Sequence, residues 1–223
     1  MKSLLPFFIS LFILSPVFAL NNSNTVSIYE LINSNDAKQI LDRVSQKYKS
    51  LESVKVDFSL QIINPDAGID ETQIGELYVK GDKYRIETEE LERMSDTESV
   101  WTHFKSEEEV QVNTFDPEEG EISPAQIFTI YEEQEFQYVV KETVGNKTTI
   151  DLLPSLEEKM PYHRIRITVN TDTNLIEKAT IFEKNGTRFI YSLDNFKSNV
   201  RIDDNYFFFN SDKNPNIDVI DLR

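Results

Sequence analysis

The sequence contains no cysteine among its 223 residues. Disulfide bonds, redox catalysis by cysteine and thiolate metal sites are therefore excluded. A chain of this length buries a sufficient core without covalent cross-links. Length alone predicts one domain, or at most two.

Basic residues are scarce. The chain has 23 Lys and Arg against 39 Asp and Glu, which gives a formal net charge of −16. Nucleic-acid binding requires a basic face, so nucleic acid is not an expected partner. The same balance argues against attachment to anionic lipid through charge. It favours solubility and permits steering towards a basic partner.

Catalytic and metal-binding patterns are missing as well. The two histidines, His103 and His163, fall in separate predicted strands with no second histidine nearby. This argues against the usual metal and Ser-His sites, and the sequence predicts no cofactor and no enzyme. Carboxylate runs such as Glu107–Glu109 are typical of solvated loops. A glycosidase pair or a weak calcium site hidden among them stays open.

Long apolar runs are absent except at the N-terminus, where Leu4–Leu14 follows Lys2 and precedes Pro16. Val17-Phe18-Ala19 completes the pattern of a secretory signal cleaved after Ala19. The run is shorter than the ~20 apolar residues of a spanning helix, although an uncleaved anchor is the alternative. We predict a signal peptide over 1–19 and a single exported domain over 20–223.

Two amphipathic helices are expected. The first begins near Asn35 or Asp36, either of which can cap it. Its apolar stripe repeats with helical spacing at Ala37, Ile40, Leu41, Val44, Tyr48 and Leu51. The second is short and begins at Ser123-Pro124, a pairing typical of a helix start. Its apolar residues Ile127, Phe128, Ile130 and Tyr131 lie on one side.

Period-2 alternation predicts most of the remaining chain as strands. The clearest are Val54–Ile62 and the pair Glu76–Lys80 and Lys83–Glu87, which flank Gly81-Asp82. Thr88–Thr97 is acidic and unpatterned and is expected to be a loop or strand edge. Further strands are expected at Val100–Phe104, Glu109–Thr114, Phe136–Glu142, Thr148–Leu153, Arg164–Val169, Leu175–Lys184, Thr187–Leu193, Tyr206–Phe209 and Ile217–Leu222. Because no β-α-β alternation appears, the fold class is mainly β (α+β), with about nine to eleven antiparallel strands.

Asn185-Gly186 between two β-like runs is a strong hairpin signal. A two-residue turn there would pair Glu183 with Arg188 and Phe182 with Phe189.

Six segments resemble the LolA family, the periplasmic carriers of outer-membrane lipoproteins in Gram-negative bacteria. The opening one is G-E-L-Y-V-K-G-D-K-Y-R-I-E at Gly75–Glu87. The others, in family order and spacing, are Ile40–Leu51, Ser95–Phe104, Asp116–Glu132, Phe182–Tyr191 and Pro215–Arg223. The likeness is greatest to the Bacteroidetes-type branch.

The resemblance implies an unclosed antiparallel half-barrel with helices lidding its concave apolar face. It implies a monomeric periplasmic carrier that shields the acyl chains of lipoproteins and catalyses no reaction. The implied partners are acylated lipoproteins and an inner-membrane lipoprotein-releasing ABC transporter. Whether an outer-membrane receptor takes part stays open.

Candidate lipid-binding residues are those on the apolar faces. From the strands they are Val54, Val56, Phe58, Leu60, Leu77, Val79, Tyr84 and Ile86. From the helices they are Ile40, Leu41, Val44, Tyr48, Ile127, Phe128 and Tyr131. Ordinary core is the competing interpretation for each, since core and cavity share one face in a half-barrel.

One position departs from the family pattern. Better-known members carry an arginine involved in lid closure where this chain has Gly81. Lys83 or Arg85 would replace it, or closure would be apolar only.

Two other functions stay open. One is a lipid-sensing regulator on the same fold, and the other is an exported hydrolase that uses a carboxylate pair.

Overall fold

The computed structural model describes residues 28–115, 136–156, 158 and 160–223. One α-helix, α1 (Ile28–Lys49), precedes the strands. The first six strands are β1 (Val54–Asn64), β2 (Ile69–Lys80), β3 (Lys83–Thr88), β4 (Leu91–Ser95), β5 (Ser99–Phe104) and β6 (Glu109–Thr114). The next five are β7 (Phe136–Val144), β8 (Lys147–Pro154), β9 (Tyr162–Asn170), β10 (Leu175–Glu183) and β11 (Arg188–Ser198). The chain ends with the short 3₁₀-helices η4 (Asp204–Phe207) and η5 (Ser211–Lys213), and with β12 (Asp218–Asp221).

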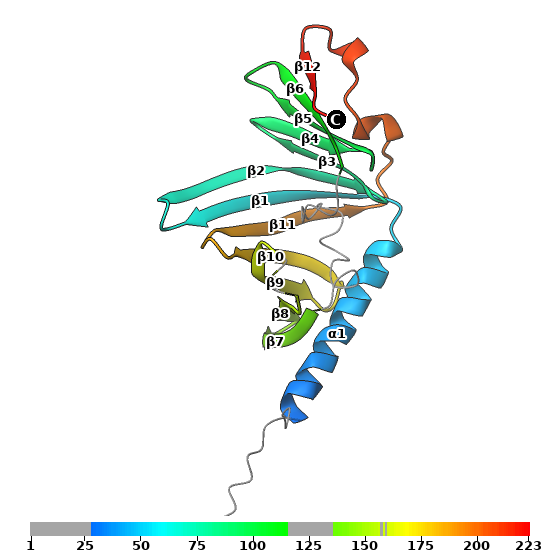
Figure 1. Cartoon of the computed structure of the whole chain (residues 1–223). Helices are drawn as coiled ribbons and strands as arrows, with labels where there is room; N and C mark the ends of the chain where they lie inside the picture. Colours follow the sequence, from blue (N-terminus) through cyan, green and yellow to red (C-terminus); the bar gives the residue numbers. More distant parts are fainter. Residues whose placement is uncertain (1–27, 116–135, 157, 159) are drawn as a thin grey trace, which may run out of the picture.

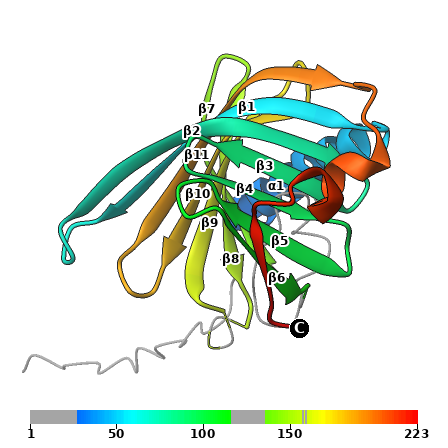
Figure 2. The same ribbon diagram turned by 90° about the horizontal axis from the view of Figure 1, so that it is seen from above.

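All twelve strands form one sheet in the order β12-β6-β5-β4-β3-β2-β1-β11-β10-β9-β8-β7. The sheet curves without closing, so β12 and β7 are its two edges (Figures 1 and 2). Every neighbouring pair is antiparallel except β12 and β6, which are parallel. The predicted fold class, a mainly β and unclosed antiparallel half-barrel, is confirmed, with one strand more than the expected upper number.

Helix α1 lies on the concave side of the sheet (Figure 2). Its main contacts are with β7, and it also contacts β10. Ala37, Leu41 and Val44 are almost completely buried, as the predicted stripe requires. The predicted start was wrong: the helix begins at Ile28, and Asn35 and Asp36 lie inside it rather than capping it. No described helix is long and apolar enough to cross a membrane.

The strand register separates the two faces of the sheet. Val56 pairs with Leu77, and Leu77 pairs with Ile86, so these side chains share the concave face. Tyr78 pairs with Arg85, and both lie on the convex face. The alternation read from the sequence therefore predicted the correct inward residues in β1–β3.

The segment after β11 packs on the convex face of β3–β6. Trp101 contacts Phe208 with ring centroids 6.4 Å apart, and the Arg85 guanidinium lies 4.4 Å from the centre of the Tyr206 ring. The Tyr206 hydroxyl donates a 2.6 Å hydrogen bond to Glu87, and Arg85 binds Glu92 at 2.7 Å. A second buried core forms beneath the segment, from Met94, Val110, Val112 and Phe207. The strand predicted at Tyr206–Phe209 was wrong, because these aromatics anchor a 3₁₀ turn to the sheet instead of extending it.

Strand β4 lies inside Thr88–Thr97, which was expected to be a loop or strand edge. Its convex residues are Glu92 and Met94. The C-terminal segment covers this face, where Arg85 pairs with Glu92 and Met94 is 1% exposed. The sequence showed no polar-apolar alternation here because the covered convex face of β4 carries both a charged residue, Glu92, and an apolar one, Met94.

The hairpin at Asn185-Gly186 has a different register from the predicted one. Phe182 pairs with Arg188, and Ile181 pairs with Phe189. Only Gly186 has a positive φ, +88°, whereas a type I′ turn needs positive φ at both central residues. The Glu183 amide donates to the Thr187 carbonyl, so the longer loop moves the pairing by one residue.

Gly75 allows β1, β2 and β3 to approach closely on the concave face. A Cβ atom there would overlap the carbonyl oxygen of Glu87 and lie 2.9 Å from two ring carbons of Phe58. The Phe58 ring therefore rests on the bare backbone of β2. Any larger residue displaces this ring or separates the strands.

We predict that Gly75→Ala lowers the free energy of unfolding by about 2–3 kcal/mol, because the added methyl group overlaps the β3 backbone and the Phe58 ring and this overpacking cannot relax locally. Urea unfolding followed by circular dichroism measures the loss. Gly81→Asn is the matched control: Gly81 has a φ of +59° and open space around it, which asparagine tolerates. Equal losses in the two variants would contradict the close-approach argument.

Candidate binding face

The concave face gathers the predicted lining residues into one hydrophobic cluster. Nine of the twelve described ones are buried: Leu41, Val44, Tyr48, Val54, Val56, Phe58, Leu77, Val79 and Tyr84. The other three, Ile40, Leu60 and Ile86, are partly buried and pack against the same cluster. Ile127, Phe128 and Tyr131 lie outside the described residues. The structure thus brings together every described residue of the predicted set.

The cluster also contains residues that were not predicted as lining. They come mainly from β7–β10: Phe136, Ile150, Leu152, Tyr162, Ile165, Ile167, Val169 and Ile176. The strict alternation of Arg164–Val169 was a usable signal for Ile165, Ile167 and Val169. What the sequence did not reveal is that β1 pairs with β11, which places both halves of the sheet around one concave face.

Helix α1 divides this face into two parts. Beneath it, Ile150, Leu152 and Ile165 are completely buried and serve as ordinary core. Among the described elements, no other helix lies over the concave face of β1–β4. The apolar residues of β1–β3 therefore continue the cluster beyond the part that α1 covers.

Tyr48 marks the boundary between the two parts. Its hydroxyl accepts a hydrogen bond from the Ile176 amide at 3.3 Å, and its ring meets Phe196 edge-on with centroids 5.7 Å apart. Burial raises the pKa of this hydroxyl far above its ordinary value. Phe196 reaches the concave side because β11 bulges at Asn195, whose φ is +51°. Tyr48 is therefore a structural anchor of the helix.

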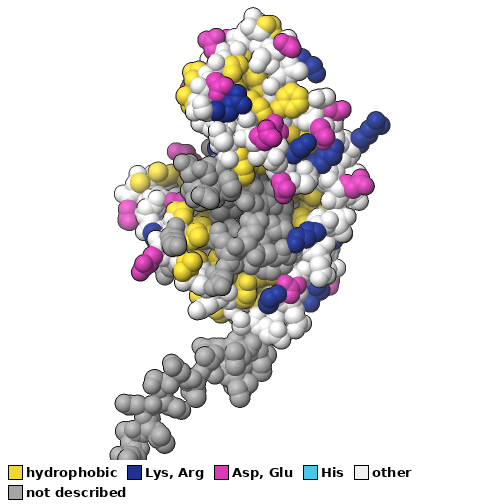
Figure 3. Space-filling model, turned by 45° about the vertical axis from the view of Figure 1, so that its right-hand side comes forward, with side chains coloured by type: hydrophobic (Ala, Val, Ile, Leu, Met, Phe, Trp, Pro, Cys, Tyr) yellow, Lys and Arg dark blue, Asp and Glu magenta, His cyan; other side chains and the backbone are white. Residues whose placement is uncertain are grey.

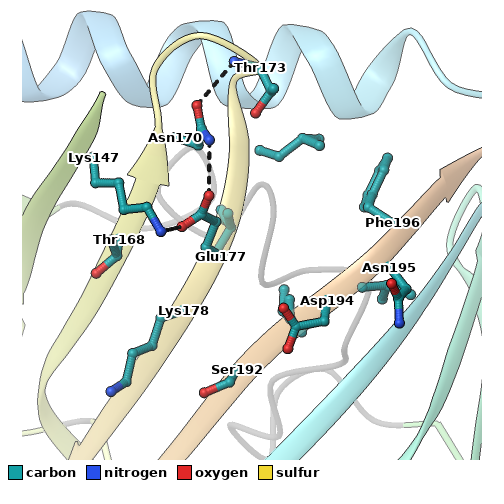
Figure 4. A pocket seen from close by; sticks show the side chains of 14 residues that line it. Lys147, Thr168, Asn170, Thr173, Glu177, Lys178, Ser192, Asp194, Asn195 and Phe196 are labelled. Atoms are coloured by element: carbon teal, nitrogen blue, oxygen red, sulfur yellow. Dashed lines mark hydrogen bonds and ion pairs between the residues drawn. The ribbon is translucent and has the colours of Figure 1, made fainter. Parts of the chain in front are cut away.

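A cavity of about 520 Å³ opens where β10 and β11 diverge (Figure 4). Their pairing ends at Lys178 and Ser192, so the strands separate beyond these residues. Val56, Leu175, Ile176, Leu193 and Phe196 supply its apolar lining. On the rim, Glu177 accepts hydrogen bonds from Lys147 at 2.6 Å and from Asn170 at 2.9 Å. These contacts hold the pKa of the Glu177 carboxyl below its usual range. The apolar cluster thus has an opening that sequence reasoning missed.

Hydrophobic side chains also reach the molecular surface on the side shown in Figure 3. They lie both at the level of the C-terminal segment and beside the centre of this view, with acidic and basic side chains between them.

Comparison with protein families gives one match. The family described as outer membrane lipoprotein carrier protein LolA matches residues 49–210, well over half of the chain. The chain belongs to the LolA family. A comparison with curated protein sequences finds no match.

Comparison with solved structures finds similar chains at low sequence identity, and the first of the following, with a TM-score above 0.5, shares the fold. An uncharacterized conserved protein from Thermus thermophilus is 9% identical, with a TM-score of 0.53, over 83% of this chain and 99% of its own. A LolA superfamily protein from Nitrosomonas europaea is 12% identical, with a TM-score of 0.44, over 78% of this chain and 97% of its own. A DUF1329 family protein from Desulfovibrio piger is 14% identical, with a TM-score of 0.49, over 79% of this chain and 97% of its own.

Within this LolA-family fold, Lys83 and Arg85, the candidate replacements for the arginine missing at Gly81, face away from the concave side. Lys83 lies 3.5 Å from Asp204, and Arg85 is held by Glu87, Glu92 and Tyr206. This placement argues against Lys83 and Arg85 as replacements, and apolar closure, the other alternative, stays a prediction. Arg93 of β4 shares the concave face with Tyr84 and donates to its hydroxyl at 3.4 Å. Sequence reasoning missed Arg93 because its segment was expected to be a loop.

The described residues provide little for hydrolytic chemistry. Asp151 is the only buried carboxylate among them, and Arg166 holds it through two hydrogen bonds of 2.6 and 2.9 Å. No group of three His, Asp or Glu residues in the described part of the chain could hold a metal ion. The apolar concave face is the feature that sets the chemistry of this fold.

Truncation should distinguish the two parts of the cluster. We predict that Leu41→Ala, under α1, lowers the free energy of unfolding by about 3 kcal/mol, because it leaves a cavity in packed core. Ile86→Ala, at the partly exposed margin, should cost about 1 kcal/mol, since less apolar area is lost. Urea unfolding of both variants measures the difference. A larger loss in Ile86→Ala would show that β3 belongs to the rigid core.

Proposed function

We propose that this chain is a periplasmic carrier that shields the acyl chains of lipoproteins. It would take them from an inner-membrane ABC transporter and deliver them to the outer membrane. The observation that carries the proposal is the apolar concave face of an unclosed sheet, which extends past α1 towards β1–β3. Membership of the LolA family supports the choice of lipoprotein as cargo.

The physical requirements of transport fit this face. Each CH₂ group of an acyl chain exposed to water costs about 0.8 kcal/mol, so an aqueous crossing requires a cover. A carrier must also release its cargo, which favours apolar contact over strong polar anchors. The described part of the concave face supplies apolar side chains from several strands, with Arg93 and Tyr84 as polar groups among them.

The site we propose combines the twelve described residues of the predicted set with the corresponding positions outside the described part of the chain, Ile127, Phe128 and Tyr131. Ile40, Leu60 and Ile86 are the most informative members. They pack on the cluster yet keep partial exposure, so an acyl chain can contact them without unfolding the core.

Export is part of the proposal. Residues 1–19 would be the signal peptide, and cleavage after Ala19 would leave the single domain 20–223 in the periplasm. Mass spectrometry of the periplasmic protein should find Leu20 as its first residue. A chain retained in the inner membrane with Met1 or Lys2 intact would contradict this step.

A lipid-sensing regulator is the second candidate, because the same apolar face could report acyl chains to a partner. The assay that separates the two is release of lipoproteins from inner-membrane vesicles. We expect release into the soluble fraction only when the purified protein and the transporter are both present. Acyl binding without any release would favour the regulator.

Polar substitution of the margin should weaken acyl binding. We predict that Leu60→Gln/Ile86→Gln raises the Kd for a fluorescent acylated lipopeptide at least about tenfold, because each change removes roughly 1 kcal/mol or more of apolar contact. The matched control is Ile74→Gln, since Ile74 is 73% exposed and lies on the convex face of β2. Fluorescence titration measures all three proteins. Equal weakening by Ile74→Gln, or no lipopeptide binding by the unaltered protein, would contradict the proposed site.

A further inference from the structure

The two halves of the convex face differ in what covers them. On β3–β6 the C-terminal segment packs over the sheet and buries Met94, Val110 and Val112. On β7–β11 the convex side chains Lys141, Lys178 and Arg188 are exposed. The second half therefore presents its own side chains to solvent, and their charge decides what can bind there.

This uncovered surface is basic, although the chain carries a net charge of −16. Two adjoining grooves of about 370 and 310 Å³ cross it and share Phe182 and Arg188. Their charged lining consists of five cations, Lys141, Arg164, Arg166, Lys178 and Arg188, and two carboxylates, Glu142 and Glu183. We call the surface formed by these five cations and Phe182 the cationic trough; its side chains come from β7, β9, β10 and β11. Lys178 also lies on the rim of the opening in Figure 4.

Neighbouring carboxylates leave most of this positive charge unpaired. Asp151 lies beneath the trough and is occupied by Arg166 through two hydrogen bonds. Arg164 is 3.7 Å from the same carboxylate, and its Nε has no hydrogen-bond partner. Lys141, Lys178 and Arg188 have no ion-pair partner within 4 Å in the described part of the chain. One buried carboxylate thus serves two guanidinium groups, and three further cations face solvent.

Phe182 fixes the arginines in place. The Arg164 guanidinium stacks 3.9 Å from the ring centre, and that of Arg166 lies 5.7 Å away. Stacking orients the planar groups and leaves N–H donors at their edges, in the arrangement that binds carboxylates bidentately. The ring is on the convex face between Arg164 of β9 and Arg188 of β11, the residues with which Phe182 pairs on its two sides.

We propose that the cationic trough binds an acidic segment, a run of Asp and Glu residues, of a partner protein. Three arginines in a groove match the planar geometry of carboxylates, and the trough has the opposite charge to such a segment. A membrane surface is the less suitable partner. The trough lies on the face opposite the apolar cluster, so docking it on anionic lipid would turn the concave face away from that membrane.

This inference is independent of the proposed carrier function. Acyl chains would occupy the concave face, whereas the acidic segment would lie on the convex face of β7–β11. Loss of acyl binding in Leu60→Gln/Ile86→Gln should leave the trough intact, and failure of either proposal leaves the other standing.

Binding of a fluorescein-labelled octaglutamate peptide to the purified protein tests the proposal by fluorescence anisotropy. We expect a Kd on the order of 100 µM at 25 mM salt, from several exposed charge pairs. It should weaken strongly at 0.5 M salt, where screening is nearly complete. Lys178→Glu/Arg188→Glu should raise the Kd at least about tenfold, since two attractive pairs become repulsive. Lys178→Gln/Arg188→Gln should give an intermediate value.

The matched control is Arg201→Glu/Lys213→Glu, which makes the same change of net charge at exposed positions outside the trough. It should change the Kd less than about twofold if local charge governs binding. Circular dichroism confirms that each variant is folded. Failure of the unaltered protein to bind the peptide, or equal losses in both charge-reversed variants, would overturn the proposal. So would trough-dependent binding to vesicles containing phosphatidylglycerol in the absence of peptide binding.

Discussion

The antiparallel pairing of β1 with β11 is the constraint on which the rest of the structure depends. β1–β6 and β7–β11 are two meanders of sequential neighbours, and this pairing alone joins them into one sheet. It runs from Val54–Ser198 to Ile63–Arg188, contacts far apart in sequence that are slow to form and costly in entropy. Once it forms, α1 and the strands of both meanders share one concave side. Without it, the inward residues of β1–β3 would lose their connection to the part of the cluster that α1 covers.

The sequence predicted those elements whose local pattern agrees with their final environment. The predictions from the alternation of β1–β3 and from the apolar stripe of α1 are confirmed, because each of these elements has one more buried and one more exposed face. It failed where distant segments decide the environment. The convex residues of β4 show no pattern in the sequence because a distant segment, the C-terminal one, buries Met94. Phe208 was predicted as a strand residue, but its ring packs on Trp101 of β5 instead. The Asn185-Gly186 register failed for a local reason: Asn185 does not take the positive φ that a two-residue turn needs.

For the binding face, the same distinction determines what could be foreseen. Leu77 and Ile86 could be assigned to one face from alternation, because their register follows from a short turn at Gly81. The contribution of Ile150 and Ile165 to that same face depends on β1–β11 pairing, which no local motif specifies. Arg93 was missed together with its strand. Inward residues within a hairpin were therefore predictable, whereas the composition of the whole face was not.

Net charge is likewise a property of the whole chain and carries no information about its distribution. The excess of Asp and Glu correctly describes most of the sequence, yet register places Arg164, Arg166 and Arg188 around one phenyl ring. Long-range fields follow the total charge, but contact recognition follows the few groups within a Debye length of about 10 Å. An acidic chain can therefore repel anionic surfaces at a distance and still bind carboxylates in a groove. Because this groove lies on the back of the sheet, its occupant and a ligand of the concave face need not compete for space.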